Sequence, residues 1–378
     1  MTRKIVPLMF AGLLLIAMFS WAKVSDSHGV TVHEWGTFTS VAGSNGEPVL
    51  WQSYGGPSDL PCFVERFGGF KNTLPGTVRM ETPVLYFYGS REETADVKVS
   101  FPRGTITEWY PRATTSANTI EWRNVRISPR AEFVFPTGDQ SHYYTARHTD
   151  SASLQVGPDK EKFLFYRGVG TFPLPLSAKL TDEGKLLVRN VGKETVAGLV
   201  VFENRGGVRR YWVAGDLRGE TVLDPSSLQG NWPGLLSDLE RILVEQGLYP
   251  KEARAMIETW TDSWFEEGTR LFYIVPQAVI DAVLPLDIQP TPIQTARVFV
   301  GRMEIITPAI QDEVRQAVTN YDRATLQKYG RFLEPIARRA GIKSALLDSI
   351  YVKYLSNASG CPDSRSSGVR VEPRPQRQ

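Results

Sequence analysis

Short apolar runs separated by turn residues dominate the chain from about residue 30 to residue 218. The run at 30–35 is rich in β-branched and aromatic residues, and 97–101 alternates apolar and polar positions as a half-buried strand does. An Asn-x-Gly-Gly turn after 199–202 supplies the positive φ angles that a tight hairpin needs. We expect further strands at 84–88, 106–110, 120–127, 143–147, 162–166, 174–180, 186–188 and 210–213.

The period of the apolar positions changes after about residue 226. Leu235, Leu239 and Ile242 follow a 3.6-residue spacing, and Pro233 suits the first turn of a helix. The same criteria predict further helices that begin at 250, 308, 322 and 343. Two short apolar runs, 271–275 and 298–300, are typical of strands.

This pattern predicts an α+β fold in two parts. A β-sandwich-like N-terminal domain would cover residues 28–218, because many short strands with Gly and Pro turns favour a sandwich. A mostly α-helical C-terminal domain with a small strand pair would cover 226–358. Residues 360–378 are rich in Pro, Ser and Arg with few apolar groups, so we expect a disordered tail.

The first 22 residues have the layout of a secretory signal peptide. Arg3 and Lys4 precede an apolar stretch at 5–19, and Ser20 and Ala22 place small residues before a cleavage point. The apolar stretch is shorter than the roughly 20 residues that span a membrane, which favours cleavage over an uncleaved anchor. We therefore expect an exported protein, periplasmic or extracellular, with no transmembrane segment after cleavage.

Composition and charge narrow the class of protein further. The chain has 378 residues, of which 42% are hydrophobic and 22% charged, as in a globular protein. Its 43 Lys and Arg against 41 Asp and Glu give a net charge of +2, which Arg3 and Lys4 supply. The chain after residue 22 is therefore neutral, which argues against nucleic acid or an anionic membrane as a partner.

Cys62 and Cys361 are the only cysteines in the sequence. Export would place them in an oxidising compartment, where a disulfide persists. A bridge between these two residues is therefore one prediction, and two buried thiols are the alternative.

Histidine is scarce, and its placement suggests one candidate metal site. If 142–150 is a strand, His148 and Asp150 share a face about 7 Å apart, close enough to bind one ion. His33 from another strand would complete a His₂-carboxylate zinc site of a metal-dependent hydrolase, with Glu34 as the general base. The alternative is that these residues have structural or surface roles.

Three tryptophans each follow a glutamate: Trp35, Trp109 and Trp122. Neighbours on a strand face opposite ways, so the favoured interpretation places Trp in the core and Glu in water. The opposite arrangement would expose the indole rings as stacking platforms for sugar rings. Arg209 and Arg210 belong to the densest local basic cluster, which would either hold an anionic ligand or protect a hairpin edge.

No motif in the sequence identifies a reaction. The chain lacks a Gly-x-Ser-x-Gly elbow, and 168–170 lacks the third glycine and the strand–helix context of a dinucleotide site. We therefore expect a non-catalytic binding or interaction protein of the bacterial envelope that needs no cofactor, with carbohydrate or another envelope component as its partner. The zinc hydrolase is the alternative, a purely structural scaffold is a third hypothesis, and the sequence leaves open whether the protein is an enzyme.

Overall fold

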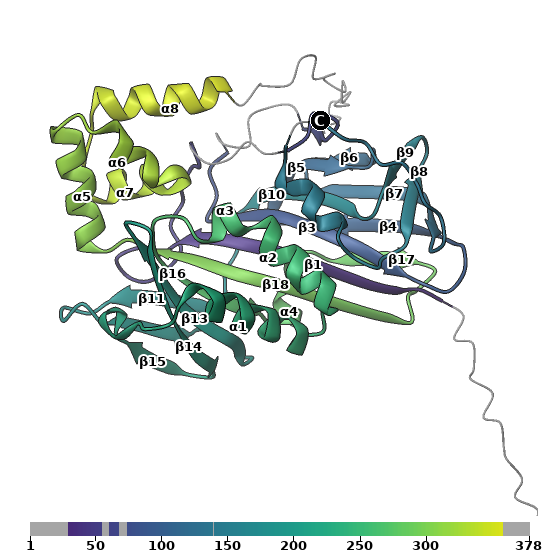
Figure 1. Ribbon diagram of the computed structural model, residues 1–378, viewed down its shortest axis with the longest axis horizontal. Coiled ribbons are helices and arrows are strands. Elements are labelled where there is room, and N and C mark those ends of the chain that lie inside the picture. The colour runs from purple at the N-terminus through teal and green to yellow at the C-terminus, as the bar shows by residue number, and fades with distance from the viewer. Residues whose placement is uncertain (1–28, 55–59, 68–73, 139, 358–378) are drawn as a thin grey trace, which may run out of the picture.

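A computed structural model describes residues 29–54, 60–67, 74–138 and 140–357 (Figure 1). The signal-peptide segment, the 360–378 tail and Cys361 lie outside these residues. Cleavage, tail disorder and the Cys62–Cys361 bridge therefore stay predictions.

The described residues form three β-sheets and several helices (Figure 1). The strands are β1 (Thr31–Val41), β2 (Glu65–Arg66), β3 (Val78–Tyr88), β4 (Glu93–Ser100), β5 (Gly104–Tyr110), β6 (Thr114–Ser116), β7 (Thr119–Ser128), β8 (Ser153–Val156), β9 (Asp159–Glu161), β10 (Leu164–Gly170), β11 (Leu176–Leu180), β12 (Leu186–Asn190), β13 (Val196–Arg205), β14 (Val208–Leu217), β15 (Glu220–Leu223), β16 (Gly268–Val275), β17 (Leu286–Gln289) and β18 (Gln294–Ile305). The helices are α1 (Trp232–Glu245), α2 (Pro250–Thr259), α3 (Thr261–Trp264), α4 (Gln277–Val283), α5 (Pro308–Thr319), α6 (Arg323–Lys328), α7 (Leu333–Arg339) and α8 (Ala345–Asn357), with short 3-10 helices η2 (His142–Arg147), η3 (Pro225–Ser227) and η4 (Gly330–Phe332).

A nine-stranded sheet is the centre of the molecule, in the order β14-β13-β16-β18-β1-β3-β10-β5-β2. Strands β1 and β18 run parallel, from the pair Thr31 and Gln294 to the pair Val41 and Glu304. Figure 1 shows these two long strands side by side, one in the purple of the N-terminal part and one in the light green of the C-terminal part. The first and last of the described strands, β1 and β18, are therefore neighbours in the middle of the sheet.

The predicted α+β fold, with a β half followed by a mostly helical half, is wrong. The structure is mostly β, and strands β16 and β18 of the second half lie between β13 and β1 of the first. The apolar runs at 271–275 and 298–300 are short because Arg270, Arg302 and Glu304 interrupt the pattern. These three charged residues are buried within the strands, so both strands are longer than their apolar runs.

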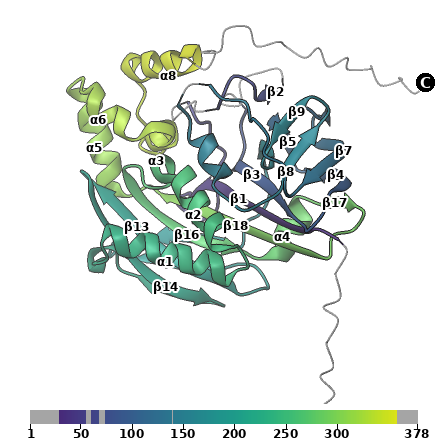
Figure 2. The same cartoon turned by 45° about the vertical axis from the view of Figure 1, so that its right-hand side comes forward.

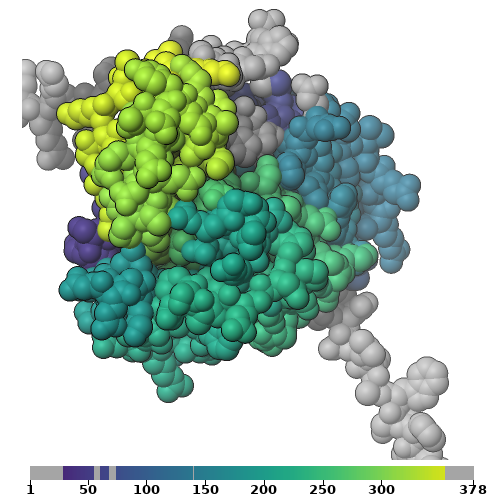
Figure 3. Space-filling model, turned by 60° about the vertical axis from the view of Figure 1, so that its left-hand side comes forward, coloured from purple at the N-terminus to yellow at the C-terminus, as the bar shows by residue number. Residues whose placement is uncertain are grey.

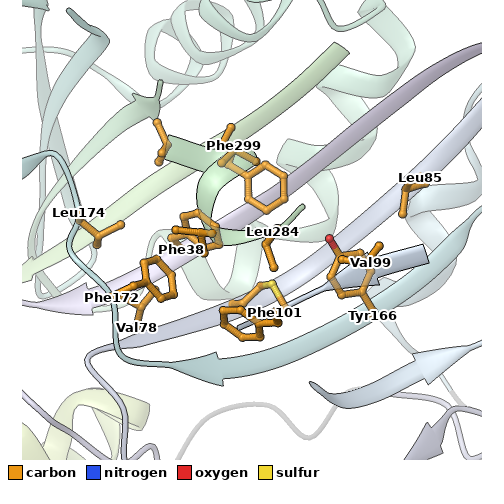
Figure 4. Close-up of a cluster of buried hydrophobic side chains, with 14 of the residues drawn as sticks. Phe38, Val78, Leu85, Val99, Phe101, Tyr166, Phe172, Leu174, Leu284 and Phe299 are labelled. Carbon is orange, nitrogen blue, oxygen red and sulfur yellow. The ribbon is translucent and has the colours of Figure 1, made fainter. Parts of the chain in front are cut away.

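Two smaller sheets cover one face of the central sheet, one with the order β11-β12-β15 and one built on β17-β4-β7-β8-β9, with β6 paired to β7. Apolar side chains from all three sheets form one continuous core between them. Figure 4 shows part of this core, where Phe38 of β1 packs against Phe299 of β18 and against Phe172. The expected sandwich confined to residues 28–218 is therefore absent, because the smaller sheets pack on a central sheet that both halves of the chain build.

Helices α1 and α2 lie over the opposite face of the central sheet (Figure 2). Leu235 and Leu239 of α1 and Met256 of α2 belong to the same buried apolar cluster as Trp35 and Val84 of the sheet. Both faces of the central sheet are thus covered, which explains why polar as well as apolar positions of β1 are buried.

Helices α5 to α8 form a small lobe at one end of the central sheet (Figure 3). Their apolar faces pack on Val41, Trp51 and Ile306, which follow or lie near the ends of the central strands. The single helix expected over 322–340 is divided into α6, η4 and α7. Gly330 at the division has φ of 45°, a left-handed conformation that glycine adopts without steric cost.

Buried ion pairs join this lobe to the sheet. Arg331 of η4 donates to Glu81 of β3 at 2.6 Å and lies 3.5 Å from Glu266. Arg302 of β18 donates to the same Glu266 at 2.9 Å. Burial, together with the neighbouring Arg270, lowers the pKa of Arg302 to about 10, so this guanidinium remains charged at neutral pH.

We expect Arg331→Met to lower the free energy of unfolding by about 3–5 kcal/mol, because Glu81 and Glu266 would each lose a buried guanidinium neighbour. Arg315→Met on α5 is the matched control: Arg315 pairs with Asp312 and makes a long hydrogen bond to the Ala340 carbonyl on the surface of the same lobe, and its removal should cost less than about 0.5 kcal/mol. Urea denaturation of the two variants measures the difference. Equal losses would show that the buried pair does not anchor the lobe.

Candidate functional site

A buried ion pair lies at the centre of the central sheet. Glu34 of β1 and Arg297 of β18 are direct neighbours in the parallel register, and Arg297 Nε donates to Glu34 Oε2 at 2.6 Å. The hydroxyl of Tyr166 donates to the other carboxylate oxygen of Glu34 at 2.6 Å. Arg297 Nη1 donates to Asp281 of α4 at 2.7 Å. Four elements from distant parts of the chain therefore meet at one guanidinium.

The surroundings of Arg297 and Tyr166 determine the charge state of each side chain. Burial by itself lowers the pKa of Arg297, but the charge of Glu34 and the hydrogen bonds to Glu34 and Asp281 outweigh it and raise this pKa above its ordinary value. Burial raises the pKa of Tyr166 well above its ordinary range, and Glu34 adds to the effect. Tyr166 therefore stays a neutral hydrogen-bond donor, and Arg297 stays a cation, across the physiological pH range.

Arg297 also forms part of the wall of a pocket of about 480 Å³. The pocket lies between α4, β17 and the first residues of β18, and its polar lining is Gln277, Asp281, Asp287, Gln289, Thr291, Thr295 and Arg297. Pro285, Leu286, Ile288 and Pro292 supply its apolar part. The Arg297 side chain is 3% exposed, and its guanidinium also interacts with the Tyr166 hydroxyl, so it belongs to the inner wall of the pocket.

The lining groups define what this pocket can bind. Asp281 and Asp287 supply acceptors only, and Gln277 and Gln289 supply both donors and acceptors. A hydroxyl group accepts one hydrogen bond and donates another, so it satisfies an amide N–H and a carboxylate at once. The arrangement therefore suits a small ligand with several hydroxyl groups.

The three predicted metal ligands each contact helix α2, but with different partners. Residues 142–147 form the 3-10 helix η2, not the expected strand, because the Ser141 side chain accepts from the Tyr143 N–H and caps the turn. His148 and Asp150 follow on the surface, where His148 lies 3.8 Å from Glu258 and Asp150 lies 2.5 Å from Lys251. The face-sharing geometry on which the zinc site depended is therefore absent.

His33 is buried and belongs to a different cluster. Its Nδ1 lies 2.8 Å from Glu252, a fully buried carboxylate that also accepts from the Tyr88 hydroxyl and from the Tyr249 N–H. Glu252 thereby caps the first turn of α2 and fixes that helix to β1 and β3. In the part of the chain that the structure describes, no three His, Cys, Asp or Glu residues lie close enough to hold a metal ion.

The tryptophans that follow glutamates are all in the core. Trp35, Trp109 and Trp122 are at most 3% exposed, so the platform interpretation is wrong and the core interpretation is confirmed. The glutamates, however, are not all in water: Glu34 and Glu108 are buried as well. They are buried because further layers cover the faces onto which they point.

Arg209 and Arg210 lie on β14, at the edge of the central sheet. The Arg209 guanidinium stacks over the ring of Trp232 at 4.1 Å, and Arg210 is opposite Glu203 on β13. They stay candidates for an anionic ligand, although both have protein neighbours of complementary character.

Sequence reasoning selected Glu34 but missed Arg297 and Asp281. A charged residue directly before the apolar run 298–300 was the available signal, since it ended the predicted strand where the true strand continues. Glu34 and Arg297 are 263 positions apart, so only the sheet topology brings them together.

No known protein-family model matches this chain, and no curated protein is similar to it in sequence. Among solved structures it is similar to the yeast delta-COP-I mu-homology domain complexed with a Dsl1 WxWxV peptide, at 7% identity and a TM-score of 0.30, over 74% of this chain and 98% of that one. The same yeast domain without the peptide gives 8% identity and a TM-score of 0.31 over the same shares. Similarity this low establishes neither a family nor a function. Among the described residues, no helix is both long and apolar enough to cross a membrane.

We expect Glu252→Gln to lower the free energy of unfolding by about 2–3 kcal/mol, because three donors around a buried carboxylate would face a neutral amide. Glu258→Gln on the same helix is the control, and its exposed contact with His148 should be worth less than about 0.5 kcal/mol. Thermal and urea unfolding measure both variants. A shift of the wild-type melting temperature on addition of EDTA would instead indicate that a metal holds this region.

Proposed function

We propose that this chain is an exported, non-catalytic binding protein of the bacterial envelope, and that its ligand is a small carbohydrate. The pocket at Arg297 is the ligand site in this proposal. The single observation that carries it is a pocket whose wall combines a buried arginine, held on both sides by carboxylates, with the carboxylate and amide groups of Asp281, Asp287, Gln277 and Gln289.

Pre-organisation supports a binding role for this pocket. Glu34 and Asp281 hold the Arg297 guanidinium from two sides, so this part of the pocket wall loses little side-chain entropy when a ligand binds. A volume of about 480 Å³ lies within the range of small-molecule sites, about 300–1,000 Å³. Pro285 and Ile288 add apolar surface that a C–H face of a sugar ring contacts favourably.

The proposal of binding without catalysis rests on the partners of the titratable groups. Glu34, the candidate general base, is fully buried and accepts hydrogen bonds from both Arg297 and Tyr166. Both oxygens of this carboxylate are therefore already engaged by donors of the protein itself. His33, His148 and Asp150 pair with Glu252, Glu258 and Lys251, so they do not form the ligand set that the zinc hydrolase hypothesis requires.

Isothermal titration calorimetry and ligand-observed NMR with D-glucose, D-galactose and D-mannose test the proposal. We expect at least one of them to bind the wild-type protein with a Kd of about 1 mM or below. Thr295→Trp would fill the pocket from β18 and should weaken this binding more than about tenfold, a loss of about 1.4 kcal/mol.

Gln294→Trp is the matched control for this substitution. Gln294 is the neighbouring exposed residue on the same strand, points to the opposite face and is not part of the pocket wall. It should bind the sugar as the wild type does. Binding of none of the three sugars, or equal binding by both tryptophan variants, would contradict the proposed function.

A further inference from the structure

Strand β1 depends on residues from the far end of the chain for one of its two neighbours. It lies between β3 and β18 in the central sheet, and all of its residues are buried. Its antiparallel ladder with β3 uses residues 78–88, whereas its parallel ladder with β18 uses residues 294–304. One edge of β1 therefore has no partner until residues beyond 290 are present.

The ionisable side chains of β1 have the same dependence. His33 Nδ1 lies 2.8 Å from Glu252 of α2, which is 219 positions away, and Arg297 donates to Glu34 at 2.6 Å from 263 positions away. Tyr166 also donates to Glu34, but this hydroxyl is neutral and brings no counter-charge. Because a buried charge without its counter-charge is costly, a pair of β1 and β3 alone would be destabilised at Glu34.

Both faces of β1 also need cover from the second half of the chain. On one face the Phe299 ring lies over Gly36 and packs against Phe38, with ring centroids 4.8 Å apart. On the other face Trp35 belongs to the same buried cluster as Met256 of α2. A two-stranded ribbon without a packed face is marginally stable in water at best. The β1–β3 pair is therefore not a stable unit by itself.

Two time scales show why this dependence matters during synthesis. At about 5–20 residues per second, the 263 positions between Glu34 and Arg297 take on the order of 10–50 s to make. Small domains that fold independently do so within milliseconds to seconds. A self-sufficient N-terminal domain would therefore fold long before β18 exists, whereas the region around β1 has to wait for it.

We infer that β1 acquires stable pairing only when β18 does, so that the position of these two strands in the sheet delays folding until most of the chain has been made. The proposed export gives this delay a use, because a polypeptide that crosses a membrane as an extended chain must not complete a stable domain beforehand. The delay follows from the strand order and needs no further segment or partner.

Pulsed hydrogen exchange during refolding of the full chain from urea tests this order, with mass spectrometry to assign protection to peptides. We expect the amides of 31–41 to gain protection at the same rate as those of 294–305, within about twofold. If the amides of 31–41 become protected together with those of 78–88, before 294–305, then β1 folds without β18 and the inference is wrong.

Two valine substitutions assign the delay to β18. Val300 lies beside Thr37 of β1 and is 2% exposed, so Val300→Ala should slow the protection of 31–41 by about threefold or more. Val314→Ala on α5 is the matched control, because this residue is equally buried but belongs to the core of the lobe. It should change the protection rate of 31–41 by less than about 1.5-fold.

Equal delays in the two variants, or an unchanged rate in Val300→Ala, would show that pairing with β18 does not limit the folding of β1. The result is separate from that of the sugar titrations. Failure of all sugars to bind would contradict the proposed function and leave the folding order intact, whereas early protection of 31–41 would contradict the folding order and leave the sugar site intact.

Discussion

The ion pair between Glu34 and Arg297 is the interaction on which the rest of the structure depends. It joins β1 and β18, which are neighbours in the middle of the central sheet, at a position where both side chains are buried. A buried charge without its partner is costly, so the pair strongly favours the register in which the two residues are adjacent. That register sets which side chains of β1 face the smaller sheets and which face α1 and α2. The same pair holds the guanidinium at the pocket.

The sequence predicted many local elements and not their arrangement. The expected strands at 84–88 and 120–127 lie within β3 and β7, and the helix expected after Pro233 is α1. These segments could be predicted because apolar periodicity is a local property. The order of strands in the central sheet could not be predicted, since β18 pairs with β1 across most of the chain length. The apolar pattern of residues 143–147 predicts a strand, but these residues form η2 because the Ser141 side chain caps the turn. Such a cap cannot be recognised from apolar periodicity.

At the candidate site, too, single residues could be predicted from the sequence but their partners could not. Glu34 was selected from its residue type, but its role changed once its partners were known, from a general base to the carboxylate that orients Arg297. Apolar periodicity does not predict the full length of β16 and β18, because arginine and glutamate interrupt the pattern even where they are paired and buried. Such pairs lie at the pocket, between β16 and β18, and where η4 docks on the sheet. The pairs at the pocket and at η4 connect parts of the chain that are far apart in sequence.

A double-mutant cycle on Glu34 and Arg297 tests the central claim most directly. The free energy of unfolding is measured for the wild type, Glu34→Gln, Arg297→Gln and the double variant. If the pair links the two strands, each single change removes about 3–5 kcal/mol, and the double variant loses at least about 2 kcal/mol less than the two losses added together. Losses that add to within about 0.5 kcal/mol would show that the two side chains act independently, and would contradict the account.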